Sequence, residues 1–171
     1  MARALGAALK IVRTGFAWCT ILLFVYMVGA IFTQVIGRYI FNFSIAGAEE
    51  TATFAQIWMV LFGAGVAMRR KQHVGIDVFI AFCPPVVQRL MLIVSTLLGL
   101  WFLWVVFSGS FALIEVGSIV RSPAMQWPMS IPYLALPIGA AYFALEFAVA
   151  MVPRWFGEAA PPAEEPLADR L

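Results

Sequence analysis

The chain has 171 residues, of which 63% are hydrophobic and 12% are charged, and its formal net charge is +2. A typical soluble domain carries about 25% charged residues, and a globule of this length has too little interior to bury so much apolar surface. This composition argues against a soluble enzyme, and the small net charge argues against a nucleic-acid-binding protein, which needs a basic face.

Four stretches without a charged residue divide the chain. They contain 24, 18, 25 and 24 residues and lie between Arg13 and Arg38, Glu50 and Arg69, Arg89 and Glu115, and Arg121 and Glu146. A helix needs about 20 apolar residues to cross about 30 Å of hydrocarbon, and these runs lack the alternation of a β-barrel strand. The sequence therefore predicts an all-α polytopic membrane protein. Its membrane domain, residues 15–152, is expected to contain four transmembrane helices, near residues 15–37, 50–68, 88–108 and 131–152.

Residues 1–14 are predicted to form a cytoplasmic amphipathic segment ahead of the first span. Their apolar side chains share one helical face with Phe16, and they are Leu5, Leu9 and Val12. This pattern is typical of a short helix that lies in the membrane interface with its cations near anionic headgroups. The first span is longer than the apolar region of a signal peptide, so we expect it to be retained.

A second amphipathic helix is predicted to connect the third and fourth spans. Its polar side chains recur at helical spacing, and they are Ser108, Glu115, Ser118 and Ser122. Apolar residues lie largely on the opposite side, as in a helix at an interface. Residues 153–171 contain too few large apolar side chains to pack, so they are predicted to form a disordered cytoplasmic tail.

The Lys and Arg residues are unequally divided between the two sides of the predicted membrane domain. With four spans both termini lie on one side, and nine of the eleven Lys and Arg residues fall there, against Arg38 and Arg121 on the other. The positive-inside rule then places both termini in the cytoplasm.

Glu146 is the sharpest candidate for a special role because it is a carboxylate inside the fourth span. A charge at the centre of a transmembrane helix costs roughly 2.5–3.5 kcal/mol on the insertion scale. Three roles fit: a proton or ion ligand, a structural partner for a basic residue of this chain or of another, and a side chain that reaches the cytoplasmic headgroups. We favour the structural pairing.

The second span offers four structural or interface candidates. Glu49 and Glu50 open it on the outer side, where carboxylates in a first helical turn stabilise the dipole by about 0.3–1 kcal/mol. One of them is also expected to pair with Arg38, whereas adjacent helical residues do not face each other, which argues against a catalytic pair. Gly63 lies on a face of small residues that lets helices approach closely, and Trp58 lies deep enough to contact lipid or a partner.

His73 and Asp77 stand four residues apart beside a basic triplet at residues 69–71. This spacing suits a metal ligand pair or a proton relay, but no third ligand is near, so we predict a structural contact in an interfacial turn. The two cysteines, Cys19 and Cys83, lie in unrelated segments and indicate neither a disulfide framework nor a metal ribbon. With so few polar residues in the spans, the sequence predicts no catalytic, cofactor or metal site and no solute pathway of its own.

Several segments, in their order and spacing around four spans, resemble the small (Q) membrane subunit of the tripartite ATP-independent periplasmic (TRAP) transporters. They are residues 38–42, 49–50, 62–65, 69–77, 122–128 and 131–139. The likeness runs from Trp18 to Val152, and it leaves out the N-terminal segment and the tail.

The resemblance implies a supporting role in the bacterial inner membrane. In that family a large membrane subunit carries the sodium and substrate sites, and a periplasmic binding protein delivers the solute, usually a carboxylate or sulfonate. The small subunit packs against the large one as a static scaffold. By this likeness the chain contacts a large subunit and membrane lipids, and the binding protein docks on the outer face, at residues 38–50 and 108–130.

Three other functions are alternatives to the scaffold. A small exporter that dimerises around a membrane carboxylate would need an acidic residue in an early span, and the first span has none. A membrane enzyme would have to combine His73 and Asp77 with Glu49 or Glu50, which fall on the opposite side of the bilayer. An unrelated membrane accessory protein also remains open.

Overall fold

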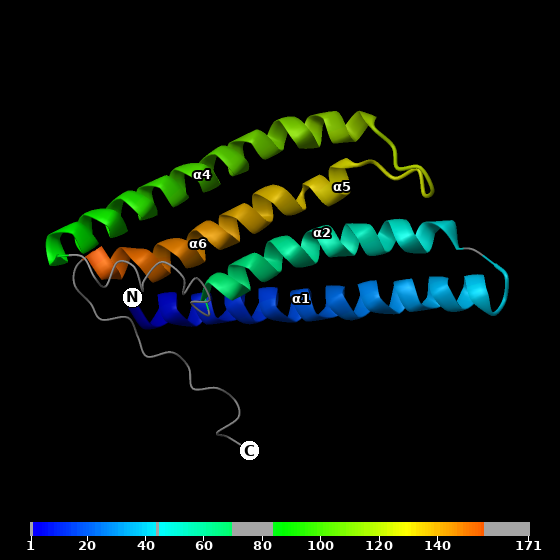
Figure 1. Cartoon of the computed structure of the whole chain (residues 1–171), viewed down its shortest axis with the longest axis horizontal. Coiled ribbons are helices and arrows are strands. Elements are labelled where there is room, and N and C mark those ends of the chain that lie inside the picture. Colours follow the sequence, from blue (N-terminus) through cyan, green and yellow to red (C-terminus); the bar gives the residue numbers. More distant parts are fainter. Residues whose placement is uncertain (1, 44, 70–83, 156–171) are drawn as a thin grey trace, which may run out of the picture.

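A computed structural model describes residues 2–43, 45–69 and 84–155 as an all-helical chain (Figure 1). Its helices are α1 (Ala2–Tyr39), α2 (Ala46–Arg69), α4 (Pro85–Ile119), α5 (Ser130–Tyr133) and α6 (Ala135–Trp155). Four segments are long and apolar enough to cross a membrane, namely Gly6–Tyr39, Gly47–Arg69, Val86–Ile119 and Ser130–Met151. The predicted all-α membrane fold with four spans is therefore confirmed.

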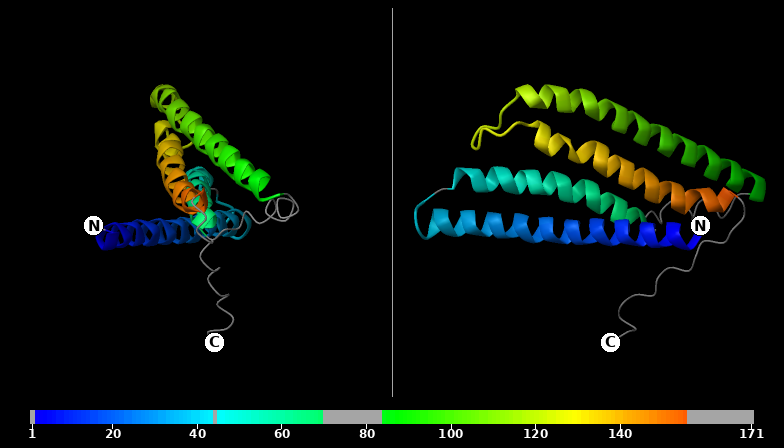
Figure 2. Two further views of the ribbon diagram at one scale, coloured as in Figure 1. Left: turned by 90° about the vertical axis from the view of Figure 1, so that its left-hand side faces the viewer. Right: turned by 180° about the vertical axis from the view of Figure 1, so that it is seen from behind.

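The four long helices form one open layer rather than a closed bundle. Their order is α1, α2, α6, α4, so that α6, the last helix in the chain, lies between α2 and α4 (Figure 1). Both α1 and α4 run at an angle to the inner pair when the layer is viewed from its end (Figure 2, left). We call the end that holds Ala2 and Trp155 the terminal end, and the end that holds residues 40–43, residue 45 and residues 120–129 the loop end.

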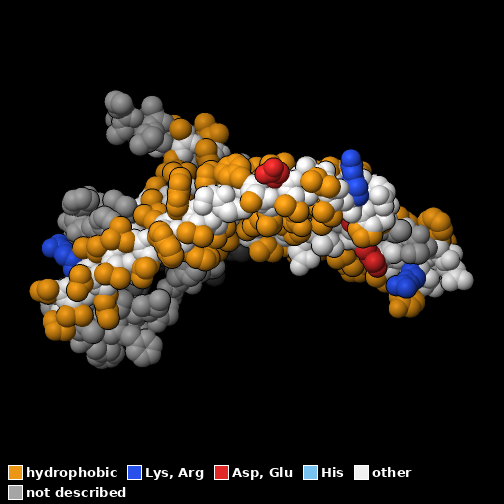
Figure 3. All heavy atoms as spheres, turned by 90° about the horizontal axis from the view of Figure 1, so that it is seen from above, with side chains coloured by type: hydrophobic (Ala, Val, Ile, Leu, Met, Phe, Trp, Pro, Cys, Tyr) orange, Lys and Arg blue, Asp and Glu red, His pale blue; other side chains and the backbone are white. Residues whose placement is uncertain are grey.

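An open layer leaves most of its apolar surface uncovered. In α1 and in α4, only 6% of the most apolar 18-residue stretch is buried. The corresponding share is 33% in α2 and 33% in the segment that comprises α5 and α6. Exposed side chains include Trp18, Trp101 and Trp104, and the face seen in Figure 3 is largely hydrophobic with few charged side chains. Such a surface is stable only against lipid or another protein.

Glycines set the close contacts between neighbouring helices. Gly65 of α2 lies directly under the ring of Tyr142 on α6, and a Cβ atom at Gly139 would stand 2.7 Å from the Cβ of Leu61. Gly99 of α4 likewise faces the ring of Phe147. Each glycine leaves room for a side chain of the facing helix, so α2 packs on α6 and α6 packs on α4.

The expected N-terminal amphipathic helix is not confirmed as a separate element. The structure continues as one helix from Ala2 to Tyr39, and the first proline of the chain is Pro84. Without a proline or a stabilised helix end between residues 1–14 and the first span, nothing interrupts the backbone hydrogen bonds. The N-terminal segment is therefore the first part of α1.

The expected connector between the third and fourth spans is also not confirmed as a separate helix. Residues 109–119 continue α4 to Ile119, and the chain then turns in a hairpin at residues 120–129. Between α5 and α6 the helix is interrupted because Pro137 has no N–H to donate to the carbonyl of Tyr133. At the other end α6 continues to Trp155, two residues beyond the expected start of the tail, and residues 156–171 lie outside the described part.

Candidate functional site

An ion pair joins the two helices that flank α2. Arg13 of α1 donates from Nε to Glu146 Oε1 at 2.8 Å and from Nη2 to Oε2 at 2.7 Å. The Glu146 side chain is 1% exposed and that of Arg13 is 23% exposed. Two parallel charge-assisted hydrogen bonds are a strong and directional arrangement. Of the roles open to Glu146, the structure therefore shows a pairing with a basic residue of its own chain.

Aromatic rings extend this contact by one helical turn toward the loop end. Phe16 stacks on Tyr142, with ring centroids 3.9 Å apart, and meets Phe62 edge to face at 4.8 Å. Because Arg13 and Phe16 are three residues apart, and Tyr142 and Glu146 four apart, each pair lies on one face of its helix. We call these five residues, Arg13, Phe16, Phe62, Tyr142 and Glu146, the α1–α6 junction.

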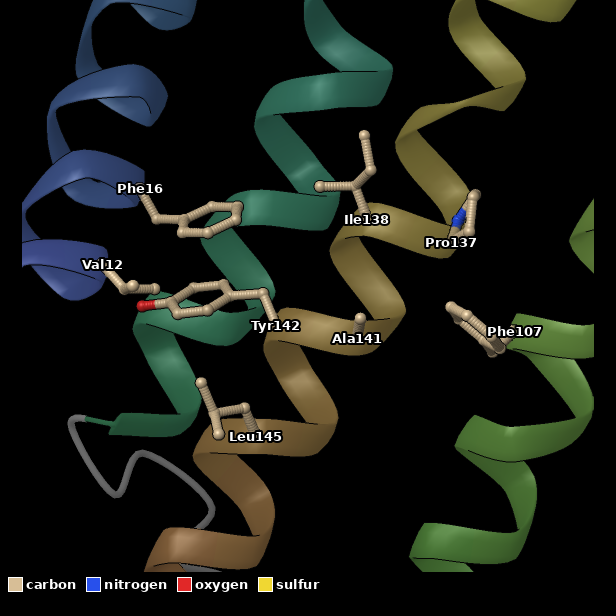
Figure 4. Close-up of a pocket in the computed structure, with 8 residues that line it drawn as sticks. All are labelled: Val12, Phe16, Phe107, Pro137, Ile138, Ala141, Tyr142 and Leu145. Carbon is tan, nitrogen blue, oxygen red and sulfur yellow. The ribbon is translucent and has the colours of Figure 1, made fainter. Parts of the chain in front are cut away.

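A shallow groove of about 420 Å³ opens beside the junction. Figure 4 shows Val12 and Phe16 on one side, Phe107 of α4 on the other, and side chains of α6 between them. The remaining lining residues are Pro137, Ile138, Ala141, Tyr142 and Leu145. Apart from the Tyr142 hydroxyl the lining is hydrocarbon, so the groove suits an apolar group and offers no acid–base pair to a substrate.

At the loop end, Glu50 holds the hairpin at residues 120–129. Its Oε2 accepts hydrogen bonds from the backbone N–H groups of Ala124, at 2.8 Å, and Met125, at 3.1 Å. Within the hairpin, the N–H of Ser122 donates to the carbonyl of Trp127 at 2.8 Å. Glu50 therefore fixes a long loop to the N-terminal part of α2.

The expected pairing of Glu49 or Glu50 with Arg38 is not what the structure shows. In the described ranges no ion pair joins Arg38 to either glutamate, and Arg38 lies in the last turn of α1 with its side chain exposed. The loop between the first two spans is closed instead by Gln34, whose Oε1 accepts from the N–H of Ile45 at 2.9 Å. Gln34 is 5% exposed, and its only signal in the sequence is a lone amide near the end of an apolar span.

The remaining candidates take structural positions or lie outside the described residues. Trp58 is half-buried and meets Phe62 edge to face at 5.4 Å. A Cβ at Gly63 would stand 3.6 Å from Thr20 Cγ2, an ordinary contact, so α1 and α2 do not require a glycine there. His73 and Asp77 fall within residues 70–83, outside the described part. No group of three potential metal ligands occurs in the ranges that the structure describes.

Known proteins resemble this chain over most of its length. The family model for tripartite ATP-independent periplasmic transporters, DctQ component, matches residues 27–157. The chain is 33% identical, over 140 residues, to the C4-dicarboxylate TRAP transporter small permease protein DctQ of Vibrio cholerae, in a match that covers 68% of this chain and 60% of that protein.

Two further relatives have similar names. A putative TRAP transporter small permease protein of Haemophilus influenzae is 28% identical over 127 residues, which cover 74% of this chain and 77% of the relative. The C4-dicarboxylate TRAP transporter small permease protein DctQ of Rhodobacter capsulatus is 28% identical over 106 residues, which cover 61% and 47%. The chain thus spans 60% of the length of the Vibrio relative and less than half of the Rhodobacter one.

Proposed function

The chain belongs to the DctQ component family of the tripartite ATP-independent periplasmic transporters, and from this premise we propose that it is the membrane scaffold of a solute importer. In this proposal it packs against a large membrane subunit that carries the solute. Import is driven by a sodium gradient. The solutes are organic acids, and C4-dicarboxylates are the class that the names of the Vibrio and Rhodobacter relatives suggest.

The observation that carries this proposal is that five buried polar or charged residues in the described part of the chain are bonded within it, and that the buried side-chain oxygens left without a partner there are the Tyr142 hydroxyl and Oε1 of Glu50. Gln34 accepts from Ile45, and Glu146 is paired with Arg13. The hydroxyls of Thr96 and Ser110 donate to carbonyls of their own helix, each at 2.6 Å, and Ser122 Oγ accepts from the N–H of Trp127. A solute pathway needs polar groups that are free to bind, so this pattern favours support over transport.

We place the loop end in the periplasm and both termini in the cytoplasm of a bacterial inner membrane. At the terminal end lie Lys10, Arg13, Arg69 and Arg89, and at the loop end lie Arg38 and Arg121. The unequal division supports this orientation. The periplasmic binding protein then docks on the loop end, where Gln34 and Glu50 hold the two loops in place.

Reconstitution in liposomes tests the scaffold role. Vesicles that contain this chain and the large subunit, supplied with the binding protein, should take up a C4-dicarboxylate such as succinate when sodium is higher outside. Vesicles that contain this chain alone should take up none, and collapse of the sodium gradient should stop the uptake of the complex. Uptake by this chain alone would overturn the proposal and favour the small exporter.

A further inference from the structure

The two inner helices of the layer each leave one stripe uncovered, and the two stripes differ in chemistry. On α6 the exposed stripe is apolar, and its members are Ile138, Ala141, Leu145 and Val149. On α2 the stripe combines three polar side chains with one valine and two alanines, and its members are Glu49, Thr53, Gln56, Val60, Ala64 and Ala67. The first four are exposed and the two alanines are half-buried. We call these six residues the α2 stripe.

The α2 stripe lies on the face of the layer opposite to the groove. Successive residues of a helix are about 100° apart, so Phe62 lies on nearly the opposite side of α2 from Val60. Phe62 packs on Phe16, and Phe16 lines the groove over α6. One face of the layer therefore presents the apolar stripe of α6, and the other presents the α2 stripe.

Lipid acyl chains cannot form hydrogen bonds with the polar side chains of the α2 stripe. Gln56 stands two residues from the middle of the 23-residue span Gly47–Arg69. Its side chain is exposed, and its carboxamide makes no hydrogen bond to any residue that the structure describes. Acyl chains offer no partner to an amide at this depth, and an amide without a hydrogen bond is costly in hydrocarbon.

A helix of another protein suits both halves of the α2 stripe. Ala64 and Ala67 allow another backbone to approach closely, as small residues do at helix contacts in membranes. Toward the loop end, Gln56 and Glu49 offer hydrogen-bond groups to polar side chains of that helix. We propose that the α2 stripe is the surface on which a transmembrane helix of the large subunit docks, an assignment that rests on the proposed function.

A second copy of this chain fits the α2 stripe less well. Two copies inserted in the same direction pair about a two-fold axis along the membrane normal, which sets each residue near its own equivalent. The Glu49 carboxylates of the two copies would then repel each other. The docking helix is therefore expected to carry a basic or hydrogen-bond-donating side chain opposite Glu49 and a polar side chain opposite Gln56.

Site-specific photo-crosslinking in the assembled complex tests this surface. The photoreactive residue p-benzoylphenylalanine replaces Val60 on α2 or, as a matched control, Leu145 on α6, and each variant is co-expressed with the large subunit and purified before irradiation. We expect an adduct with the large subunit from position 60 and none from position 145.

Two results would overturn the docking surface while leaving the scaffold role intact. They are an adduct from position 145 alone, and an adduct between two copies of this chain from position 60. Failure of every variant and of the wild type to co-purify with the large subunit would overturn the scaffold role as well.

Two substitutions provide an independent measurement. Ala67→Phe should block close approach and lower the amount of co-purified large subunit by about tenfold, which corresponds to about 1.4 kcal/mol, whereas Ala141→Phe on the α6 stripe should leave it unchanged. Gln56→Leu removes one interhelical hydrogen bond and should lower the amount by about threefold. Unchanged co-purification of Ala67→Phe would overturn the proposal, provided that the expression level of the variant matches that of Ala141→Phe.

Discussion

Arg13 supplies both of the hydrogen bonds that make burial of the Glu146 carboxylate tolerable, at 2.8 and 2.7 Å. Removal of one partner from a buried ion pair costs about 3–5 kcal/mol because the other charge stays buried without compensation. The guanidinium side is 23% exposed, so a value near the lower end of this range is expected. This places the α1–α6 junction among the contacts on which the fold depends most.

We predict that Arg13→Met destabilises the isolated chain by about 3 kcal/mol, because the Glu146 carboxylate then stays buried alone. The double variant Arg13→Met, Glu146→Leu should recover most of this loss, since neither charge remains. Thermal unfolding in detergent, followed by circular dichroism, measures both. Lys10→Met, which removes an exposed cation one turn earlier on α1, should stay within about 0.5 kcal/mol of the wild type. A double variant as unstable as Arg13→Met would contradict the ion-pair explanation.

The sequence predicts some of the residues that stabilise the structure, but it does not predict the partners of those residues. Glu146 stands out as a carboxylate in an apolar span, but its partner lies 133 residues away, in a segment expected to form a separate interfacial helix. Glu50 is recognisable as an acid near the start of the second span, but its bonds to the N–H groups of Ala124 and Met125 depend on the fold of the hairpin. Such partners are set by tertiary packing, which periodicity does not encode.

At the scale of elements, hydropathy predicts which segments span the membrane, but it does not predict which helices pack side by side. The number of spans agrees with the prediction because length and apolarity are local properties. The placement of α6 between α2 and α4 depends on glycines that face bulky side chains of another helix, such as Gly65 under Tyr142 and Gly99 against Phe147. A glycine in an apolar run looks the same whether it faces lipid or a neighbouring ring.

We predict that Gly139→Ala and Gly65→Ala each destabilise the chain by about 1–3 kcal/mol, because a methyl group at either site overpacks the contact between α2 and α6. Gly63→Ala is the matched control, since its Cβ would stand 3.6 Å from Thr20 Cγ2. It should be neutral or stabilising by up to about 1 kcal/mol through helix propensity. Thermal unfolding in detergent distinguishes them, and equal losses at the three positions would contradict the glycine contacts described above.

The layer as a whole is built from helices of unequal length. The 38 residues of α1 extend about 57 Å, whereas the 21 residues of α6 extend about 32 Å, close to the thickness of the hydrocarbon core. The outer helices must therefore tilt or project beyond the core. In the structure they run at an angle to the inner pair (Figure 2, left). Lys10 and Arg13 lie in the part of α1 that belongs to the terminal end. Cations at that end favour a cytoplasmic location for it.

The orientation of the layer can be tested by labelling single cysteines. In a background where Cys19 and Cys83 are replaced by serine, Ala124→Cys places an exposed thiol in the hairpin of the loop end, and Ala7→Cys places one near the start of α1. A membrane-impermeant maleimide should label Ala124→Cys in intact spheroplasts and label Ala7→Cys only after the membrane is permeabilised, because a charged reagent does not cross hydrocarbon. The reverse pattern would place the loop end in the cytoplasm and remove the basis for docking a periplasmic binding protein there.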